Sequence, residues 1–210
     1  MMGLHLNEVV AMRQDNKIKK PDLSYLKAFF LSIKNPKTIS RAAVFNCALL
    51  GCTLTLFPVL ARSCGIWVNL SSSIPPGIYH QAEGAILRGD CILSCVPSSA
   101  AALAYERHYI GYGNCPMSTA PVGKYAVGLP GDQARINQEG IVINGTKLNS
   151  TKPLELDIEK RTLEPFMLDR QLSEDEYLLA GETKESYDSR YFGPVSKKEI
   201  KGKIEAVYLF

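Results

Sequence analysis

Three consecutive serines and one distant lysine are the residues of this sequence whose types and surroundings could support nucleophilic chemistry. The serines, at positions 71–73, lie in NLSSSIPPGIYH, which spans residues 69–80. Lys124 lies in PVGKYAVGLPGD, where the only other charged residue is the aspartate of the final turn. A serine hydrolase needs a hydroxyl, a base that removes its proton, and donors for the oxyanion that forms. The sequence offers histidine or lysine as that base.

Histidine and lysine make different demands as the base. His80 and His108 are available, but nothing in the sequence places an acid to orient either ring, as a Ser-His-Asp arrangement requires. A lysine is a base only when its amine is neutral, so its pKa must fall well below its usual value of about 10.4. Burial in an apolar strand lowers the pKa because it disfavours the charged form. Lys124 is therefore a candidate base, although a lysine on a strand is more often an exposed edge residue.

The sequence predicts neither a metal site nor a cofactor. The three histidines, His5, His80 and His108, are scattered, and none of the six cysteines has the short Cys-x-x-Cys spacing of a zinc or redox site. The net charge of +3 is too small to indicate nucleic acid as a partner.

A long apolar segment precedes the serines. Residues 42–61, AAVFNCALLGCTLTLFPVLA, carry no charge, and about 20 such residues suffice to cross a hydrocarbon core of about 30 Å. The alternative of a buried core helix would need fewer residues in a small soluble domain. A cleaved signal peptide is a second alternative, but its apolar core is usually shorter, and its basic region is rarely as long as residues 1–41. We expect an uncleaved transmembrane helix over residues 42–61.

The charges on either side of this segment predict its orientation. Residues 1–41 hold eight basic and three acidic residues, and three of the basic residues, at positions 34, 37 and 41, lie close before the segment. Only Arg62 lies close after it. The positive-inside rule therefore places residues 1–41 in the cytoplasm and residues 62–210 on the far side of the membrane. The sequence predicts a single-pass membrane protein, with the lipid bilayer as one partner.

The cysteines fit this orientation. Two lie within the apolar segment, and four, at positions 64, 91, 95 and 115, would lie in an oxidising compartment, where disulfides persist. Cys95 and Cys115 flank an excursion of about twenty residues, so a bridge between them would close a long loop. This pair is a candidate disulfide.

Strands and turns dominate the sequence after residue 62. Strands are expected at residues 122–127, 133–137 and 141–144, with Pro-Gly, Gln-Glu-Gly and Asn-Gly turns after them. The late segments EYLLAGE, RYFGPV and IKGKIEAVYLF are also expected to be strands, and residues 149–173 to be a loop. The predicted fold class is mostly β, with a coiled or folded-over sheet that buries the short strands.

A turn and a short helical segment are also expected after residue 62. Arg88-Gly89-Asp90 lies between two apolar runs and is interpreted as a hairpin turn rather than as an adhesion signal. The segment SSAAALAYERH, within the excursion between the two cysteines, is expected to form a helical turn.

Three segments together carry a resemblance to a known family. NLSSSIPPGIY has the form Asn-x-Ser-x-Ser-x-Pro-x-Gly-x-Tyr, KYAVGLPGD has the form Lys-x-x-x-Gly-Leu-Pro-Gly-Asp, and SYDSRYFGPV follows near the C-terminus. In this order, behind an apolar segment, they resemble the catalytic boxes of bacterial type I signal (leader) peptidases. The first box matches better the TraF branch, the conjugative-transfer peptidases that mature pilin precursors. The resemblance covers about residues 42–210, and residues 1–41 lie outside it.

The resemblance implies roles for the serines and the lysine. Ser73 matches the nucleophile, which in the family stands two residues before the proline and four before the glycine of the first box. Lys124 matches the general base. Ser71 matches the residue whose hydroxyl helps the Ser73 backbone N–H to hold the oxyanion. Alternation along an extended segment would place Ser71 and Ser73 on one face, in agreement with these roles.

The third box implies supporting residues. Ser186 matches the hydroxyl that bonds the lysine amine and aims it at the nucleophile. Asp188 and Arg190 resemble the ion pair that supports the site, and the alternative is a surface pair worth less than about 1 kcal/mol. The excursion between Cys95 and Cys115 resembles a paired-cysteine segment that stands near the site in the TraF branch.

The sequence departs from the leader-peptidase pattern at two places. Tyr125 stands where arginine usually follows the base, and Glu182 and Thr183 stand where the last box usually has Asp and Asn. These departures leave the Ser73–Lys124 dyad in place. They make a specialised peptidase a better expectation than a housekeeping one.

The resemblance therefore implies a serine endopeptidase of the bacterial cytoplasmic membrane, with its catalytic domain in the periplasm. Its expected substrate and partner is a precursor protein, a pilin or another protein with a signal sequence, and other proteins of a conjugation apparatus are further expected partners. The alternative is a non-catalytic single-span subunit of a conjugation or secretion apparatus. A self-cleaving Ser-Lys repressor would share a related β fold, but the apolar segment and the lack of a DNA-binding helical domain argue against it.

Overall fold

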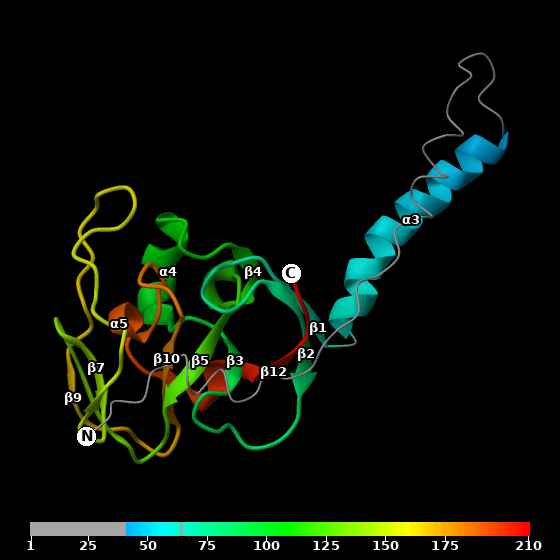
Figure 1. Ribbon diagram of the computed structural model, residues 1–210. Coiled ribbons are helices and arrows are strands. Elements are labelled where there is room, and N and C mark those ends of the chain that lie inside the picture. Colours follow the sequence, from blue (N-terminus) through cyan, green and yellow to red (C-terminus); the bar gives the residue numbers. More distant parts are fainter. Residues whose placement is uncertain (1–40, 64) are drawn as a thin grey trace. The chain divides into compact units, whose positions relative to one another are not determined.

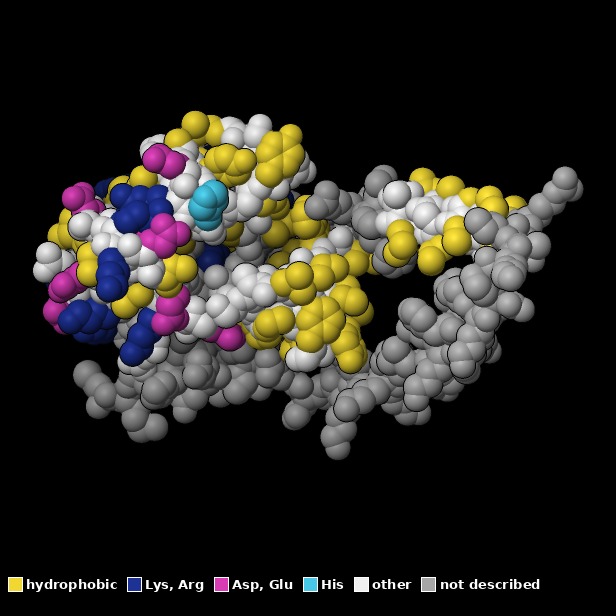
Figure 2. All heavy atoms as spheres, turned by 90° about the horizontal axis from the view of Figure 1, so that it is seen from above, with side chains coloured by type: hydrophobic (Ala, Val, Ile, Leu, Met, Phe, Trp, Pro, Cys, Tyr) yellow, Lys and Arg dark blue, Asp and Glu magenta, His cyan; other side chains and the backbone are white. Residues whose placement is uncertain are grey.

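The computed structural model describes residues 41–210 except Cys64, and the predictions for residues 1–40 lie outside the described part. The chain divides into two units, and residues 41–67 and 68–210 belong to different ones. In the first, α3 (Arg41–Ser63) is a helix of 23 residues with exposed apolar side chains such as Phe45 and Leu54. Figure 2 shows hydrophobic side chains along this helix.

The helix expected over residues 42–61 is therefore confirmed as a helix, and its bounds exceed the prediction by one residue before and two after. Among the described residues, none of the helices combines the length and the apolarity that a membrane crossing requires.

The second unit is built on a seven-stranded sheet, in which strands distant in sequence lie side by side (Figure 1). The pairings among β2, β12, β3, β5, β10 and β11 are antiparallel. The strands follow one another across the sheet as β1 (Ile66–Asn69), β2 (Gly77–Ala82), β12 (Ile200–Leu209), β3 (Cys91–Ser94), β5 (Val122–Gly128), β10 (Glu176–Ala180) and β11 (Val195–Ser196). This confirms the mostly β fold class.

A second sheet of four strands holds two of the strands expected from the sequence, those at residues 133–137 and 141–144. Its order is β8 (Thr146–Lys147), β7 (Gly140–Ile143), β6 (Gln133–Asn137) and β9 (Leu168–Gln171). The turn between β7 and β8 is Asn144-Gly145, and both residues have positive φ, 50° and 78°. Such φ values suit the tight hairpin turn that an Asn-Gly pair favours. The strands expected at residues 122–127, 133–137 and 141–144 are confirmed to within one residue as β5, β6 and β7.

Two predictions for the late chain are wrong in part. Residues 168–171 lie within the expected loop but form β9, which pairs with β6 through the register Ile136 to Leu168. The segment RYFGPV was expected to be a strand, but its first residues belong to the short helix α5 (Ser189–Phe192). The side chain of Asp188 caps this helix by accepting the N–H of Arg190, which a local strand pattern does not reveal.

The hydrophobic core joins the large sheet to the excursion between the two cysteines. The excursion forms α4 (Ser98–Glu106) and β4 (Tyr112–Cys115), so the helical turn expected there is a helix. Small side chains on α4, Ala101 and Ala104, pack in one buried cluster with residues of β3, β5, β10 and α5. The structure contains a disulfide between Cys95 and Cys115, whose Cα atoms are 5.6 Å apart. The excursion is therefore part of the folded unit of residues 68–210.

The turn at Arg88-Gly89-Asp90 ties two motifs together. Arg88 donates from Nη2 to both carboxylate oxygens of Asp132, at 2.9 and 2.7 Å, and Asp132 is the last residue of the Leu-Pro-Gly-Asp turn after β5. Asp90 accepts the N–H of Leu87 at 2.9 Å and forms an ion pair with Lys203 at 3.2 Å. Both charged side chains thus serve internal contacts. The segment is a turn, but the expected hairpin is wrong, because β12 lies between β2 and β3 in the sheet.

Candidate active site

The first candidate residues lie in a turn between β1 and β2, and the side chain of Asn69 organises that turn. Its Nδ2 donates to the carbonyls of Ser71, Ile74 and Pro75 at 2.9, 3.0 and 3.2 Å. Its Oδ1 accepts the N–H and the hydroxyl of Ser71 at 3.1 and 2.8 Å. Such local side-chain bonds to the backbone are typical of asparagine in turns.

The turn corrects one part of the sequence argument. Residues 71–74 form a turn and bend rather than an extended segment, so alternation does not describe where Ser71 and Ser73 point. Ser71 is exposed and its hydroxyl bonds Asn69, whereas Ser73 is half-buried. The structure therefore brings Ser73, but not the Ser71 hydroxyl, into the group of contacts described next.

Residues next to the serine fix the turn on the sheet. Ile74 is 1% exposed and packs over Gly123 of β5, where an added Cβ would lie 2.7 Å from Ile74 Cδ1. The Tyr79 hydroxyl donates to the Pro75 carbonyl at 2.6 Å. Gly123 directly precedes Lys124, so the close packing at this glycine brings the turn next to the position of the lysine.

Lys124, Ser73 and Ser186 form a compact group of polar side chains. Lys124 Nζ lies 2.6 Å from Ser73 Oγ and 2.8 Å from Ser186 Oγ. The two hydroxyl oxygens are 3.3 Å apart. Lys124 comes from the middle of the large sheet, and Ser186 comes from the segment between β10 and α5. The geometry suits proton transfer between the Ser73 hydroxyl and the amine.

Burial changes the chemistry of the lysine. Lys124 is 3% exposed, and this burial lowers its pKa to about 8 because the charged amine loses its hydration. The Asp188 carboxylate acts against this lowering, and the Arg190 guanidinium adds to it. A substantial fraction of the amine is therefore neutral near pH 8, and an exposed-edge interpretation of Lys124 is wrong.

Asp188 and Arg190 form a buried ion pair rather than a surface pair. Their side chains are 0% and 1% exposed. The guanidinium donates to both carboxylate oxygens, from Nε to Oδ1 and from Nη2 to Oδ2, each at 2.8 Å. Bidentate geometry of this kind gives the strongest charge-assisted hydrogen bonds. The surface-pair alternative is therefore wrong, because the fold after β10 turns both side chains inward.

The ion pair shapes the segment that carries Ser186. The Arg190 guanidinium donates to the carbonyls of Thr183, Lys184 and Ser186 at 3.1, 3.1 and 2.9 Å. Asp188 Oδ2 accepts the N–H of Gly181 at 2.9 Å. The Arg190 guanidinium and the Asp188 carboxylate thus hold the turn between β10 and α5 beside Lys124.

Gly181 and Glu182 are site residues to which the sequence argument gave no role. A Cβ on Gly181 would lie 2.2 Å from Ser186 Oγ and 3.1 Å from the Ser73 carbonyl oxygen, so only glycine fits there. The Glu182 N–H donates to that same carbonyl at 2.9 Å, and Glu182 Oε1 accepts the Tyr125 hydroxyl at 2.9 Å. The sequence signal for Glu182 was its departure from the family pattern, together with that at Tyr125, whereas Gly181 gave no such signal.

Aromatic rings connect the disulfide-closed segment, residues 95–115, to the same turn. Tyr187 stands between Ser186 and Asp188 in the chain, and its ring centroid lies 4.8 Å from that of Tyr109. The Tyr187 ring also stacks on Tyr191, with the centroids 5.6 Å apart, and meets the ring of Phe192 edge-on at 5.7 Å. The disulfide-closed segment thus packs against the residue that separates two candidate site residues.

The histidines lie elsewhere. His80 is exposed, and its Nδ1 lies 2.8 Å from the Gln81 carbonyl oxygen, while His108 is exposed beyond the end of α4. The hydrogen bonds described for the Ser73 hydroxyl go to Lys124 and Ser186. A histidine base is therefore not supported.

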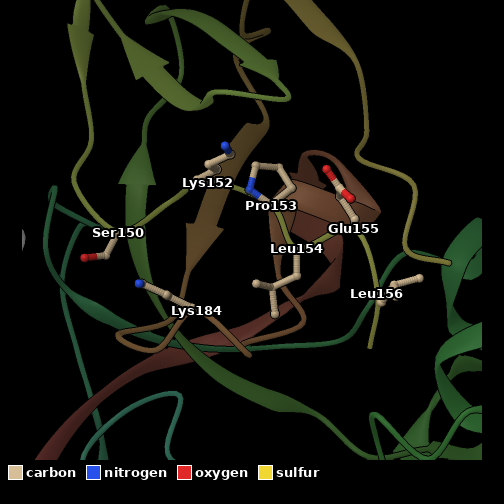
Figure 3. A pocket seen from close by; sticks show the side chains of 7 residues that line it. All are labelled: Ser150, Lys152, Pro153, Leu154, Glu155, Leu156 and Lys184. Carbon is tan, nitrogen blue, oxygen red and sulfur yellow. The ribbon is translucent and has the colours of Figure 1, made fainter. Parts of the chain in front are cut away.

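A cavity of about 440 Å³ lies beside the turn that carries Ser186 (Figure 3). Lys184 lies at its edge, and the other lining residues come from one segment of the expected loop: Ser150, Lys152, Pro153, Leu154, Glu155 and Leu156. Neither Ser73 nor Lys124 lines it.

The chain is similar to several known proteins. The family described as signal peptidase, peptidase S26, matches residues 47–209. A plasmid transfer protein TraF from Escherichia coli is 32% identical over 143 residues, which are 67% of this chain and 81% of that protein. A conjugal transfer protein TraF from Agrobacterium fabrum is 30% identical over 173 residues, 81% of this chain and 97% of that protein. Among solved structures, a signal peptidase I from Enterococcus faecalis V583 is 23% identical over 58% of this chain and 98% of that chain, with a TM-score of 0.35.

Proposed function

Because the chain belongs to the signal peptidase family, peptidase S26, we propose that it is a serine endopeptidase that cleaves signal or leader sequences with a Ser73–Lys124 dyad. The motifs resemble those of TraF-type peptidases, and two of the chain's relatives are TraF proteins, so the motifs and the overall sequence similarity agree. The observation that carries the proposal is the 2.6 Å separation of Lys124 Nζ from Ser73 Oγ in a buried setting. A lysine with a lowered pKa next to a serine hydroxyl is one of the established ways to activate that nucleophile.

Acylation uses the groups already in place. Neutral Lys124 takes the Ser73 proton while Oγ attacks the carbonyl carbon of the scissile peptide bond. The tetrahedral intermediate collapses as the carbon–nitrogen bond breaks, and Lys124 gives the proton to the departing amine. Ser186 holds the amine toward Ser73 throughout, since its hydroxyl lies 2.8 Å from Nζ.

Two donors are proposed for the oxyanion, the Ser73 backbone N–H and the Ser71 hydroxyl. The Ser71 hydroxyl donates to Asn69 in the structure. It must therefore rotate toward the oxyanion when substrate binds, and a hydroxyl hydrogen rotates readily to suit its acceptor. Donors of this kind stabilise the charge that develops in the transition state.

Deacylation defines the product. Water activated by Lys124 would release the acyl group from Ser73 as a linear product. Where the cut removes a C-terminal segment, the acyl group is the mature part of the precursor, and attack by its own amino terminus would release it as a circle. The relatives' names refer to conjugal and plasmid transfer, so we propose that the substrate is a precursor protein of a conjugation apparatus, a pilin precursor in the first place. It would pair with the sheet as an added strand and present a small residue before the cut.

We further propose that α3 anchors the enzyme in the cytoplasmic membrane, with residues 62–210 in the periplasm. The exposed apolar side chains of α3 and the basic residues before it support this arrangement. Fusions of alkaline phosphatase and of a cytoplasmic reporter after residue 210 test it. Phosphatase activity without reporter activity is expected, and the reverse would overturn the proposed orientation.

The proposed activity is tested by co-expressing the full chain with candidate pilin precursors and measuring the intact mass of the products. Cleavage would appear as loss of the mass of the removed segment. Ring closure, which requires that the removed segment is C-terminal, would appear as the further loss of one water. Ser73→Ala and Lys124→Ala are expected to abolish processing in protein that stays folded and in the membrane fraction. Unchanged processing by either variant would refute the dyad and favour a non-catalytic subunit.

A further inference from the structure

The two positions at which this chain departs from the usual leader-peptidase pattern are in contact. Tyr125 replaces the arginine that usually follows the base, and Glu182 replaces the aspartate of the last box. The Tyr125 hydroxyl donates to Glu182 Oε1 at 2.9 Å. A phenol and a carboxylate thus meet where the usual residues are an arginine and an aspartate.

This contact is joined directly to the candidate nucleophile. The backbone N–H of Glu182 donates to the Ser73 carbonyl at 2.9 Å. Tyr125 is the neighbour of Lys124 in β5, and β10, which leads to Glu182, pairs with β5 through the register Ala180 to Tyr125. The Tyr125–Glu182 bond therefore links the strand that carries the base to the backbone group that holds the nucleophile.

The surroundings keep the phenol a hydrogen-bond donor. Tyr125 is 7% exposed and pairs across the sheet with Cys91 of β3. Burial, and then the Glu182 charge, raise the pKa of the Tyr125 hydroxyl far above its usual value. Burial and the Glu182 charge also raise the pKa of the Cys91 thiol to about 12. Both groups stay protonated near neutral pH, so the Tyr125 hydroxyl can donate its hydrogen bond to the Glu182 carboxylate at that pH.

We propose that Tyr125 and Glu182 are positioning residues that hold the Ser73 turn at reacting distance from Lys124. This inference rests on the proposed function. Ser73 belongs to a turn rather than to a strand, so the sheet ladder does not fix its backbone, whereas Lys124 is fixed within β5. The Asn69 side chain organises the turn internally, and the Glu182 N–H ties it to the segment after β10. Small displacements of a nucleophile cost much of its reactivity, because the reacting atoms must meet in a narrow geometry.

The test measures acylation of the full chain in detergent by a serine-reactive β-lactam. Ser73 Oγ attacks the lactam carbonyl carbon, the ring carbon–nitrogen bond opens, and Lys124 delivers the proton to the nitrogen, so the protein gains the mass of the β-lactam. Intact mass spectrometry gives the maximal acylation rate and the concentration for half-maximal rate. Tyr125→Phe and Glu182→Ala are expected to lower the maximal rate about 10- to 100-fold. The concentration for half-maximal rate should stay unchanged.

A rescue variant and a control separate positioning from general damage. Tyr125→Arg keeps a donor opposite the carboxylate and is expected to retain a rate within about threefold of the wild type. Tyr177→Phe removes a hydroxyl from another buried tyrosine, in β10, and should leave the rate unchanged. A wild-type rate in Tyr125→Phe would overturn the proposal. An equal loss in Tyr125→Arg and Tyr125→Phe would also overturn it.

The failure of this proposal can be told from the failure of the proposed function. An adduct that forms equally in Ser73→Ala, or that never forms on the wild type, contradicts the dyad itself. An adduct that depends on Ser73 and Lys124 but is indifferent to Tyr125→Phe contradicts only the positioning role.

Discussion

Lys124 Nζ lies 2.6 Å from Ser73 Oγ although 51 residues separate the two in the chain. The pairing of β3 with β5 places the lysine in the middle of the large sheet, and the turn before β2 carries the serine to it. The contact is buried at the lysine and half-buried at the serine. In the proposed mechanism, the protonation state of the Lys124 amine therefore controls the reactivity of Ser73.

The first prediction concerns pH. Because the pKa of Lys124 is lowered to about 8, the neutral amine becomes the major form above that pH rather than above about 10.4. The maximal acylation rate should therefore rise about tenfold per pH unit below pH 8 and level off above it. Acylation by the β-lactam, followed by intact mass between pH 6 and 10, measures this profile. A rate that falls as pH rises would contradict the role of Lys124 as base.

The second prediction concerns the hydroxyl that holds the amine. Ser186→Ala removes the 2.8 Å contact to Lys124 Nζ and leaves the amine free to rotate away from Ser73. We expect the maximal acylation rate to fall about 10- to 100-fold, as for loss of a hydrogen bond to a charged or polarised group. The control is Ser94→Ala, because Ser94 is buried in β3 and bonds only backbone carbonyls in the described contacts. Equal losses in the two variants would argue against a positioning role for Ser186.

The third prediction concerns the buried ion pair. Asp188→Asn leaves the Arg190 guanidinium buried without its charged partner, and breaking a buried pair in this way costs about 3–5 kcal/mol. The free energy of unfolding, from chemical denaturation of the full chain in detergent, should fall by about that amount. In the matched variant Asp169→Asn the broken pair, with Arg135, is more than half exposed on both sides, and the loss should be under about 1 kcal/mol. Similar losses in both variants would show that burial does not strengthen the pair.

The fourth prediction concerns the disulfide-closed segment. The double variant Cys95→Ala, Cys115→Ala opens a loop with a sequence separation of 20, and the lost constraint on the unfolded chain is worth about 3 kcal/mol. The maximal acylation rate should fall as well, because Tyr109 of this segment packs against Tyr187 beside Ser186. Tyr109→Ala with the disulfide intact should reproduce the loss of rate with a smaller loss of stability. A normal rate in both variants would remove any link between the segment and the site.

The sequence by itself determined the parts of this protein that depend on local patterns. Apolar runs, alternation and Gly- and Pro-containing turns placed β5, β6 and β7 to within one residue, and they identified the helix around residues 42–61. Its apolar strand made Lys124 a candidate base, and the resemblance of the motifs to signal peptidases implied Ser73 as the nucleophile. The position of Cys95 and Cys115 at the two ends of one excursion suggested their pairing. The strands and turns could be predicted from the sequence because strand period and turn chemistry act over a few neighbouring residues.

The tertiary structure alone decided which of these residues touch and which are buried. It turned Asp188 and Arg190 inward, directed the Ser71 hydroxyl to Asn69, and joined Tyr125 to Glu182 across 57 residues of sequence. No local pattern specifies these outcomes, because they depend on the register in which distant strands pair and on how the intervening turns pack. Burial in turn sets the electrostatics, so the lowered pKa of Lys124 is a property of the folded sheet and not of its sequence segment.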